Sequence, residues 1–336
     1  MVTGSGSGTP PAGSQGSGSI SFSERYAPPK PPRWRRVFSV ETLQSVLTFL
    51  VAVGLIAVIG YLTWVAIERS GRLADPPERS AANQAVAPPA DSKVIELTSA
   101  DGTVLSAWST PSKAKKSTTA VILVHDAGGE RADLKRLAAA LRAEHDVLTL
   151  DLRGHGASAD AATTLGPAEA EDVRAAIEAV AEQGRERIAL VGVGLGASSV
   201  LAAAGGDSRV DGIVAIGPWP RVADAIAAQI KEDDVPLAWP ADWATLVAML
   251  FRTGRDVTSS DVMDTVARTS APILLVAGTD DPLLPAATLR TLENLAPDLT
   301  TWPVEGDRDD AAAVITDERG IDRIVKFLDA AFKRGD

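Results

Sequence analysis

A run of 26 residues without a charge, from Thr42 to Ile67, constrains the fold of this chain more than any other feature. As a helix it would be about 39 Å long, whereas the hydrocarbon core of a bilayer is about 30 Å thick. Tyr61 and Trp64 stand near its C-terminal end, as is typical of aromatic side chains at a membrane interface. We predict a single membrane-spanning signal-anchor helix within residues 37–67, with membrane contact over residues 42–67.

Two other interpretations of this run are weaker. A buried helix of a soluble domain would not be expected between a Gly/Ser-rich tail and a Pro/Ala-rich linker. A cleaved signal peptide would have a shorter apolar region, followed by a small-x-small cleavage site that is not clear here.

The charges on either side of the run predict its orientation. Five cations precede it, namely Arg25, Lys30, Arg33, Arg35 and Arg36. Two cations follow it and are diluted by three acidic residues within residues 68–78. Because positive flanks stay inside, we expect a cytoplasmic N-terminus and a C-terminal domain outside the cytoplasmic membrane.

Composition divides the rest of the chain. Residues 1–36 are rich in Gly, Ser, Pro and basic side chains and are expected to be a disordered tail. Residues 68–92 are rich in Ala, Pro and charge and are expected to form an extended linker. Residues 93–336 have the pattern of a folded domain, and beyond residue 93 the chain has 24 Lys and Arg against 38 Asp and Glu. This acidic balance argues against binding to nucleic acid or anionic lipid headgroups.

The domain alternates strand and helix patterns. Asp101-Gly102 between two β-rich runs predicts a hairpin. Short apolar runs then alternate with helical patterns, which is typical of an α/β fold with a mostly parallel sheet and helices on both faces. The strands are expected at residues 94–97, 103–108, 120–124, 147–150, 188–191, 210–216, 273–277 and 300–304. The helices are expected at residues 131–144, 166–183, 284–295 and 319–333, with another directly after residue 194.

About fifty residues, 218–271, fit no strand–helix unit and predict a helical cap over the C-terminal edge of the sheet. Trp219, Trp239, Trp243 and Phe251 either line a space beneath this cap or pack it onto the sheet, and we favour packing.

Four motifs follow in order along the domain. Residues 121–129 (VILVHDAGG) and 151–158 (DLRGHGAS) each continue a strand into a loop. Residues 188–198 (IALVGVGLGAS) predict a strand, a glycine-flanked turn and a helix. Residues 273–285 (ILLVAGTDDPLLP) predict a further strand and loop. In this order and spacing they resemble the α/β-hydrolase superfamily, in particular its lysophospholipase, monoacylglycerol lipase and serine aminopeptidase-like branch. The resemblance covers residues 94–333 and implies the α/β-hydrolase fold.

The resemblance also implies a catalytic triad of nucleophile, acid and base, and two of its positions are changed here. Gly194 stands at the place of the nucleophile and Asp281 at that of the acid. Asp309 stands where the base histidine is expected. The chain has three histidines, at 125, 145 and 155, and all of them precede residue 194. No triad in the order Ser, Asp, His can be assembled, because no histidine follows residue 155, and Gly194 itself has no side chain to attack a carbonyl.

Other residues offer weaker routes to chemistry. Ser198 and Ser199 lie one helical turn beyond Gly194, without a base. His125 and His155 are expected to brace loops by hydrogen bonds. A group of aspartates could converge at the rim of a pocket under the cap. We favour a solvated loop or helix cap as their role over a Ca²⁺ site. The group consists of Asp280, Asp281, Asp307, Asp309 and Asp310.

The backbone N–H groups of Ala127 and Leu195 are expected to form an oxyanion-like site. The sequence therefore predicts a membrane-anchored, catalytically degenerate hydrolase-like protein that binds an acyl- or ester-like ligand or a protein partner. It implies no cofactor and no metal. The alternative is an active ester or acyl hydrolase with a nonstandard nucleophile and base. A third hypothesis is that the membrane anchor and the basic tail matter more for function than the pocket of the domain.

Overall fold

The computed structural model describes residues 39–75, 86–114, 117–259 and 261–334. The predicted tail, residues 1–36, and residues 76–85 of the predicted linker lie outside these ranges. Residues 68–74, which were expected to begin the extended linker, are instead helical and belong to the helix that ends at Ala74. The chain divides into two units, Met1–Val58 and Ile59–Asp336.

Helix α3 (Val40–Ala74) is unbroken. Ser39 accepts a hydrogen bond from the Thr42 N–H at its start (3.2 Å), and Glu41 lies in the first turn, where negative charge is favourable. The apolar residues up to Val58 are exposed, and the helix is long and apolar enough to cross a membrane. It lies near the N-terminus and is suited to act as a membrane anchor.

The second unit contains an eight-stranded sheet in the order β1-β2-β4-β3-β5-β6-β7-β8. The pairs β1–β2 and β2–β4 are antiparallel, and all other pairs are parallel. The predicted hairpin and mostly parallel sheet are confirmed. The strands are β1 (Lys93–Thr98), β2 (Val104–Thr110), β3 (Thr119–Val124), β4 (Asp146–Leu150), β5 (Arg187–Val193), β6 (Val210–Ile216), β7 (Ile273–Gly278) and β8 (Leu299–Val304).

Alternate side chains of the central strands enter two separate hydrophobic cores. In β3, for example, Ile122 belongs to one core and Leu123 to the other. Because strand side chains alternate between faces, a continuous apolar run is needed where helices cover both sides.

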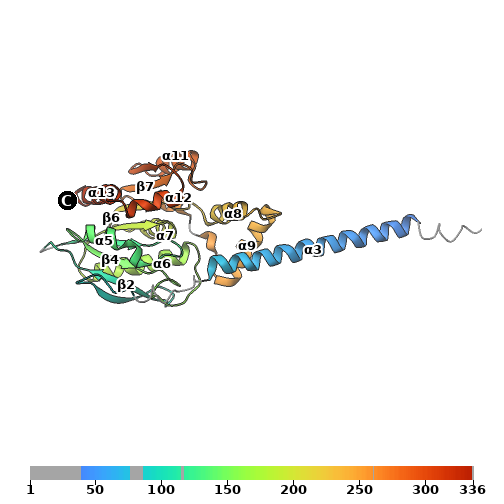
Figure 1. The fold of residues 1–336 in the computed structure, drawn as a ribbon, viewed down its shortest axis with the longest axis horizontal. Coiled ribbons are helices and arrows are strands. Elements are labelled where there is room, and N and C mark those ends of the chain that lie inside the picture. Colours follow the sequence, from blue (N-terminus) through green and yellow to red (C-terminus); the bar gives the residue numbers. More distant parts are fainter. Residues whose placement is uncertain (1–38, 76–85, 115–116, 260, 335–336) are drawn as a thin grey trace, which may run out of the picture. The chain divides into compact units, whose positions relative to one another are not determined.

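Helices α6 (Pro167–Glu182) and α7 (Leu195–Ala204) contribute to the first core, and α5 (Lys135–Leu141) and α13 (Glu318–Arg334) to the second (Figure 1). The remaining elements outside the insertion described next are η1 (Arg131–Leu134), α11 (Ala286–Leu295), α12 (Arg308–Ala312) and η3 (Ala313–Ile315).

The insertion between β6 and β7 is helical, as predicted. It contains α8 (Val222–Glu232), α9 (Ala238–Thr253), η2 (Val257–Ser259) and α10 (Val262–Val266).

The expectation for the cap aromatics was correct only for Trp219, which is buried and donates from Nε1 to the Leu165 carbonyl (2.9 Å). Trp239, Trp243 and Phe251 neither line a space beneath the cap nor pack it onto the sheet, since they are 75%, 62% and 83% exposed. The reason is the rotation of α9, which buries its face of Ala241, Thr245 and Met249.

Candidate functional site

Gly194 alone forms the turn between β5 and α7, and its backbone has a conformation that favours glycine. Its φ is +51° and its ψ is −110°, a region that is costly for a residue with a Cβ. A Cβ on Gly196 would lie 2.5 Å from the carbonyl oxygens of Val124 and His125, so α7 packs directly against the end of β3. The segment has the strand–turn–helix backbone of a nucleophile elbow with no side chain at its apex.

Asp126 fills the space in front of Gly194. Its Oδ1 accepts hydrogen bonds from the backbone N–H groups of Ala127 and Leu195, both at 2.7 Å. A Cβ built on Gly194 would lie 1.8 Å from the same oxygen. The Asp126 carboxylate therefore occupies both the site between the two predicted oxyanion donors and the space of any side chain at position 194.

Electrostatics favour the carboxylate in this place. Leu195 is the first residue of α7, and the N-terminus of a helix has a partial positive charge. Hydrogen bonds from N–H groups to a carboxylate are roughly twice as strong as neutral ones. In acyl hydrolases a pair of backbone N–H groups stabilises the oxyanion of the tetrahedral intermediate, and this is the role predicted for the N–H groups of Ala127 and Leu195. Here the Asp126 carboxylate is the anion that these two N–H groups bind.

Asp281, the predicted acid, is buried three residues after the end of β7 and pairs with an arginine. Its Oδ1 accepts from the Leu283 N–H (2.9 Å), and its Oδ2 lies 3.4 Å from Nε of Arg308. The guanidinium of Arg308 also stands 5.5 Å from the ring centre of Trp219, close enough for a cation–π contact. Arg308 thus holds the carboxylate that would orient a base histidine in a triad.

Asp309, the predicted base position, lies at the exposed start of α12, and the side chain that meets Asp281 is its neighbour Arg308. Asp307 caps α12 by accepting from the N–H groups of Asp309 and Asp310, while Asp310 accepts from the Asp307 N–H. This reciprocal arrangement satisfies the free amides of the helix start. Within the described ranges, no group of three or more His, Asp or Glu side chains is arranged to hold a metal ion.

The sequence matches the family model of the alpha/beta hydrolase family over residues 121–334. The chain belongs to the α/β hydrolase family.

Solved structures show the same fold. An esterase of Pyrococcus furiosus is 20% identical, with a TM-score of 0.58 over 77% of this chain and 98% of that one. E-2-(Acetamidomethylene)succinate hydrolase is 22% identical, with a TM-score of 0.51 over 70% of this chain and 100% of that one. A thermophilic esterase of Thermogutta terrifontis is 19% identical, with a TM-score of 0.52 over 71% and 99%. No curated protein sequence matches the chain.

Two of the histidines of this α/β hydrolase brace loops near the elbow. His125 is buried, with Nδ1 2.7 Å from the Asp126 carbonyl oxygen and Nε2 accepting from the Leu152 N–H (3.0 Å). His155 accepts from the Gly128 N–H (3.3 Å), and its ring centre is 5.1 Å from that of His125. Both rings hold the loop after β3 against the loop after β4, the bracing role expected for them.

His145 lies near the N-terminal ends of the parallel strands, whereas the elbow lies at their C-terminal ends. Its Nδ1 is 2.7 Å from the Thr119 hydroxyl and its Nε2 is 2.9 Å from Asp329. Thr119 is the first residue of β3, whereas the elbow follows the last residue of β5. The two contacts of His145 therefore tie α13 to the start of β3, and His145 stands apart from Gly194.

We predict that His125 makes the protein acid-sensitive. Its pKa is lowered to about 4, chiefly because burial disfavours the charged ring and also because of the nearby His155. Below the ordinary value near 6.5, the unfolded chain therefore binds a proton that the folded chain does not. The free energy of unfolding should fall by about 3 kcal/mol between pH 7 and pH 4 through this group.

Denaturant unfolding of the full chain in detergent across this pH range measures the effect. The variant His125→Asn should lose correspondingly less stability over the same range. Equal losses in the two proteins would assign the acid sensitivity to other groups.

Ser198 and Ser199 are buried and engaged with backbone groups. Ser198 Oγ accepts from the Trp219 N–H (3.0 Å), and Ser199 Oγ donates to the Leu195 carbonyl (2.7 Å). None of these contacts involves a histidine, so neither hydroxyl has the base that a nucleophile needs.

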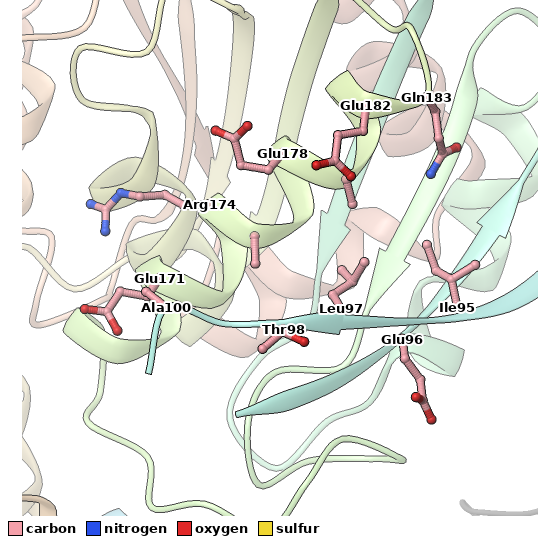
Figure 2. Close-up of a pocket in the computed structure, with 12 residues that line it drawn as sticks. Ile95, Glu96, Leu97, Thr98, Ala100, Glu171, Arg174, Glu178, Glu182 and Gln183 are labelled. Carbon is pink, nitrogen blue, oxygen red and sulfur yellow. The ribbon is translucent and has the colours of Figure 1, made fainter. Parts of the chain in front are cut away.

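A groove of about 920 Å³ lies between β1 and α6, away from the elbow. Figure 2 shows Glu171, Glu178 and Glu182 on α6 and Leu97 on β1 among its lining residues. Arg255 pairs with Glu171, and Arg209 pairs with Glu178. The groove has no histidine in its lining and does not include Gly194, Asp126 or Asp281.

Proposed function

We propose that this chain is a membrane-anchored α/β hydrolase-fold protein that acts by binding and does not hydrolyse acyl groups. The observation that carries the proposal is the position of Asp126, whose Oδ1 accepts both oxyanion-type N–H bonds and overlaps the space of a side chain at 194. A substrate carbonyl would have to displace this carboxylate from two charge-assisted hydrogen bonds.

The pairing of Asp281 with Arg308 supports the same conclusion. In a triad the acid orients the histidine and stabilises its imidazolium form. Here the permanent cation Arg308 stands beside Asp281. Arg308 cannot act as a general base, because its guanidinium does not deprotonate in proteins. Since the anion site is already filled, we assign the binding role to a protein partner at the membrane, with an acyl- or ester-like ligand as the second choice.

The proposed location follows from α3 and its flanking charges. The helix is long and apolar enough to anchor the chain in the cytoplasmic membrane. The excess of cations before it favours a cytoplasmic N-terminus and a domain on the outer side.

Hydrolysis assays on the full chain in detergent micelles test the loss of catalysis. With p-nitrophenyl acetate and a fluorophosphonate probe, we expect no turnover or labelling above that of the heat-denatured protein. A matched gain-of-function variant, Asp126→Gly/Gly194→Ser/Arg308→His, removes the internal anion and restores a nucleophile and a base beside Asp281. It should react with the probe, whereas Gly194→Ser alone should not. Robust labelling of the natural chain would refute the proposal.

An active ester hydrolase remains the alternative, favoured by the family and by the names of the similar structures, which include esterases. Its nucleophile would be Ser198, Ser199 or the Asp126 carboxylate itself. If the natural chain turns over an ester, the variants Ser198→Ala, Ser199→Ala and Asp126→Ala identify the group, since loss of its nucleophile abolishes the reaction.

A further inference from the structure

The outer face of α9 has a stripe of large apolar side chains. They recur every three or four residues and therefore share one side of the helix. The stripe consists of Trp239, Trp243, Val247, Leu250 and Phe251, which are between 44% and 83% exposed. Leu237, directly before the helix, is 50% exposed as well. Contiguous apolar surface with aromatic side chains marks a place where a protein meets another apolar phase.

Contacts within the second unit place α9 beside the last turns of α3. The Tyr61 hydroxyl donates to the carbonyl of Pro236 (3.3 Å), just before α9 begins. At the other end of α9, Arg252 donates from Nε and Nη2 to Asp75 Oδ1 at 2.9 and 2.7 Å. Between Tyr61 and Asp75 on α3, Arg69 pairs with Asp233, the residue directly after α8. The last turns of α3, from Tyr61 onward, and α9 therefore run side by side in the same direction.

This alignment gives each residue of α9 a level along the anchor. From Val40 to Tyr61 the helix rises about 32 Å, which is the thickness of a hydrocarbon core. Tyr61 and Trp64 then stand at the outer interface, where aromatic rings are favoured. Pro236 is at the level of Tyr61, so Trp239 lies about one turn further out. Phe251, twelve residues later, lies about 18 Å beyond Trp239.

We infer that the first two turns of α9 form a second membrane contact, in which Leu237, Trp239 and Trp243 enter the outer interface of the bilayer beside α3. Their rings extend the aromatic belt of Tyr61 and Trp64, and Phe251 lies above it. The contact is apolar, and the exposed acidic residues Asp233 and Asp234 stand next to it, so it does not depend on anionic lipid. It holds the domain at a fixed height on the membrane. The inference rests on the proposed membrane anchorage and is independent of the loss of hydrolysis.

Site-directed spin labelling tests this depth order, and the natural chain has no cysteine to interfere. The full chain with a single cysteine is labelled with a nitroxide and placed one copy per phosphatidylcholine nanodisc. The variants are Val51→Cys in the anchor, Trp239→Cys and Phe251→Cys on α9, and Lys326→Cys on the exposed side of α13. Accessibility of each label to oxygen is compared with accessibility to a water-soluble nickel complex.

The ratio of oxygen to nickel accessibility should be highest at residue 51 and severalfold higher at 239 than at 326. Residue 251 should lie between 239 and 326, and addition of phosphatidylglycerol should leave the order unchanged. A label at 239 as open to nickel as that at 326, with residue 51 protected, would overturn the inference and leave the anchor standing. Loss of protection at residue 51 would overturn the anchorage and the inference together. Protection of residue 239 only in discs with two copies, with spin–spin broadening, would assign the stripe to a contact between copies.

Discussion

Replacing Gly194 by alanine is expected to lower the free energy of unfolding by about 3–5 kcal/mol. The backbone conformation at φ +51° costs roughly 1–3 kcal/mol for a residue with a Cβ. The new Cβ would also lie 1.8 Å from Asp126 Oδ1. The carboxylate must then give up at least one of its hydrogen bonds from the N–H groups of Ala127 and Leu195, and one hydrogen bond to a charged group is worth about 1.5–3 kcal/mol. Denaturant unfolding of the full chain in detergent measures the loss.

A double-mutant cycle separates overlap from backbone strain. In the background Asp126→Ala the overlap is gone, so Gly194→Ala should cost about 2 kcal/mol less there. Gly206→Ala is the matched control, since Gly206 has φ +83° and nothing lies within 4 Å of its added Cβ. Its cost should be the same with and without Asp126. If Gly194→Ala costs no more than Gly206→Ala and Asp126→Ala brings no relief, the carboxylate does not occupy the apex of the elbow.

The sequence predicted the fold well because its signals are local. Buried parallel strands need continuous apolar runs, and residues 120–124 and 273–277 have them where β3 and β7 form. The elbow was also visible, since three glycines at 192, 194 and 196 are required by positive φ or close packing. Such features depend on a few neighbouring residues and can be recognised from the sequence alone.

The sequence did not predict that Asp126 occupies the N–H groups of Ala127 and Leu195, because this arrangement results from a contact between two loops. Asp126 and Gly194 are 68 positions apart, and nothing in residues 121–129 says which way the carboxylate points. The usable signal was their joint occurrence, a carboxylate next to the predicted oxyanion donor Ala127 and a glycine at the apex of the elbow. The family resemblance placed Asp309 at the base position. In the structure its neighbour Arg308 meets Asp281 instead, because Arg308 is the first residue of α12.

The aromatic side chains of α9 were misplaced for a related reason. Positions 239, 243, 247 and 251 recur every four residues, and this spacing predicts one helical face. It does not say whether that face is turned inward. The opposite face, with Ala241, Thr245 and Met249, has smaller side chains and lets α9 pack closely. Tertiary packing thus overrides the rule that aromatic residues are buried.

Loss of Arg153 is expected to destabilise the chain by about 3–5 kcal/mol, because it leaves a buried carboxylate without its partner. Arg153 donates to Asp172 from Nε (3.0 Å) and Nη2 (2.6 Å) and to Asp101 from Nη1 (2.6 Å). Asp172 is fully buried, and burial raises its pKa even with Arg153 present. The variant Arg153→Met keeps the packing of the side chain and removes the charge, and denaturant unfolding at pH 7.5 measures the cost.

The chemistry of Asp172 makes this prediction specific. In Arg153→Met the carboxyl should take up a proton more readily, so the difference from the natural chain should shrink as the pH falls. The double variant Arg153→Met/Asp172→Asn should recover part of the stability at pH 7.5, because no buried charge remains unpaired. Arg209→Met is the matched control, since Arg209 pairs with Glu178 and Asp207 nearer the surface and its loss should cost about 1 kcal/mol or less. Equal costs for Arg153→Met and Arg209→Met would show that the Arg153–Asp172 pair does not stabilise the domain from within.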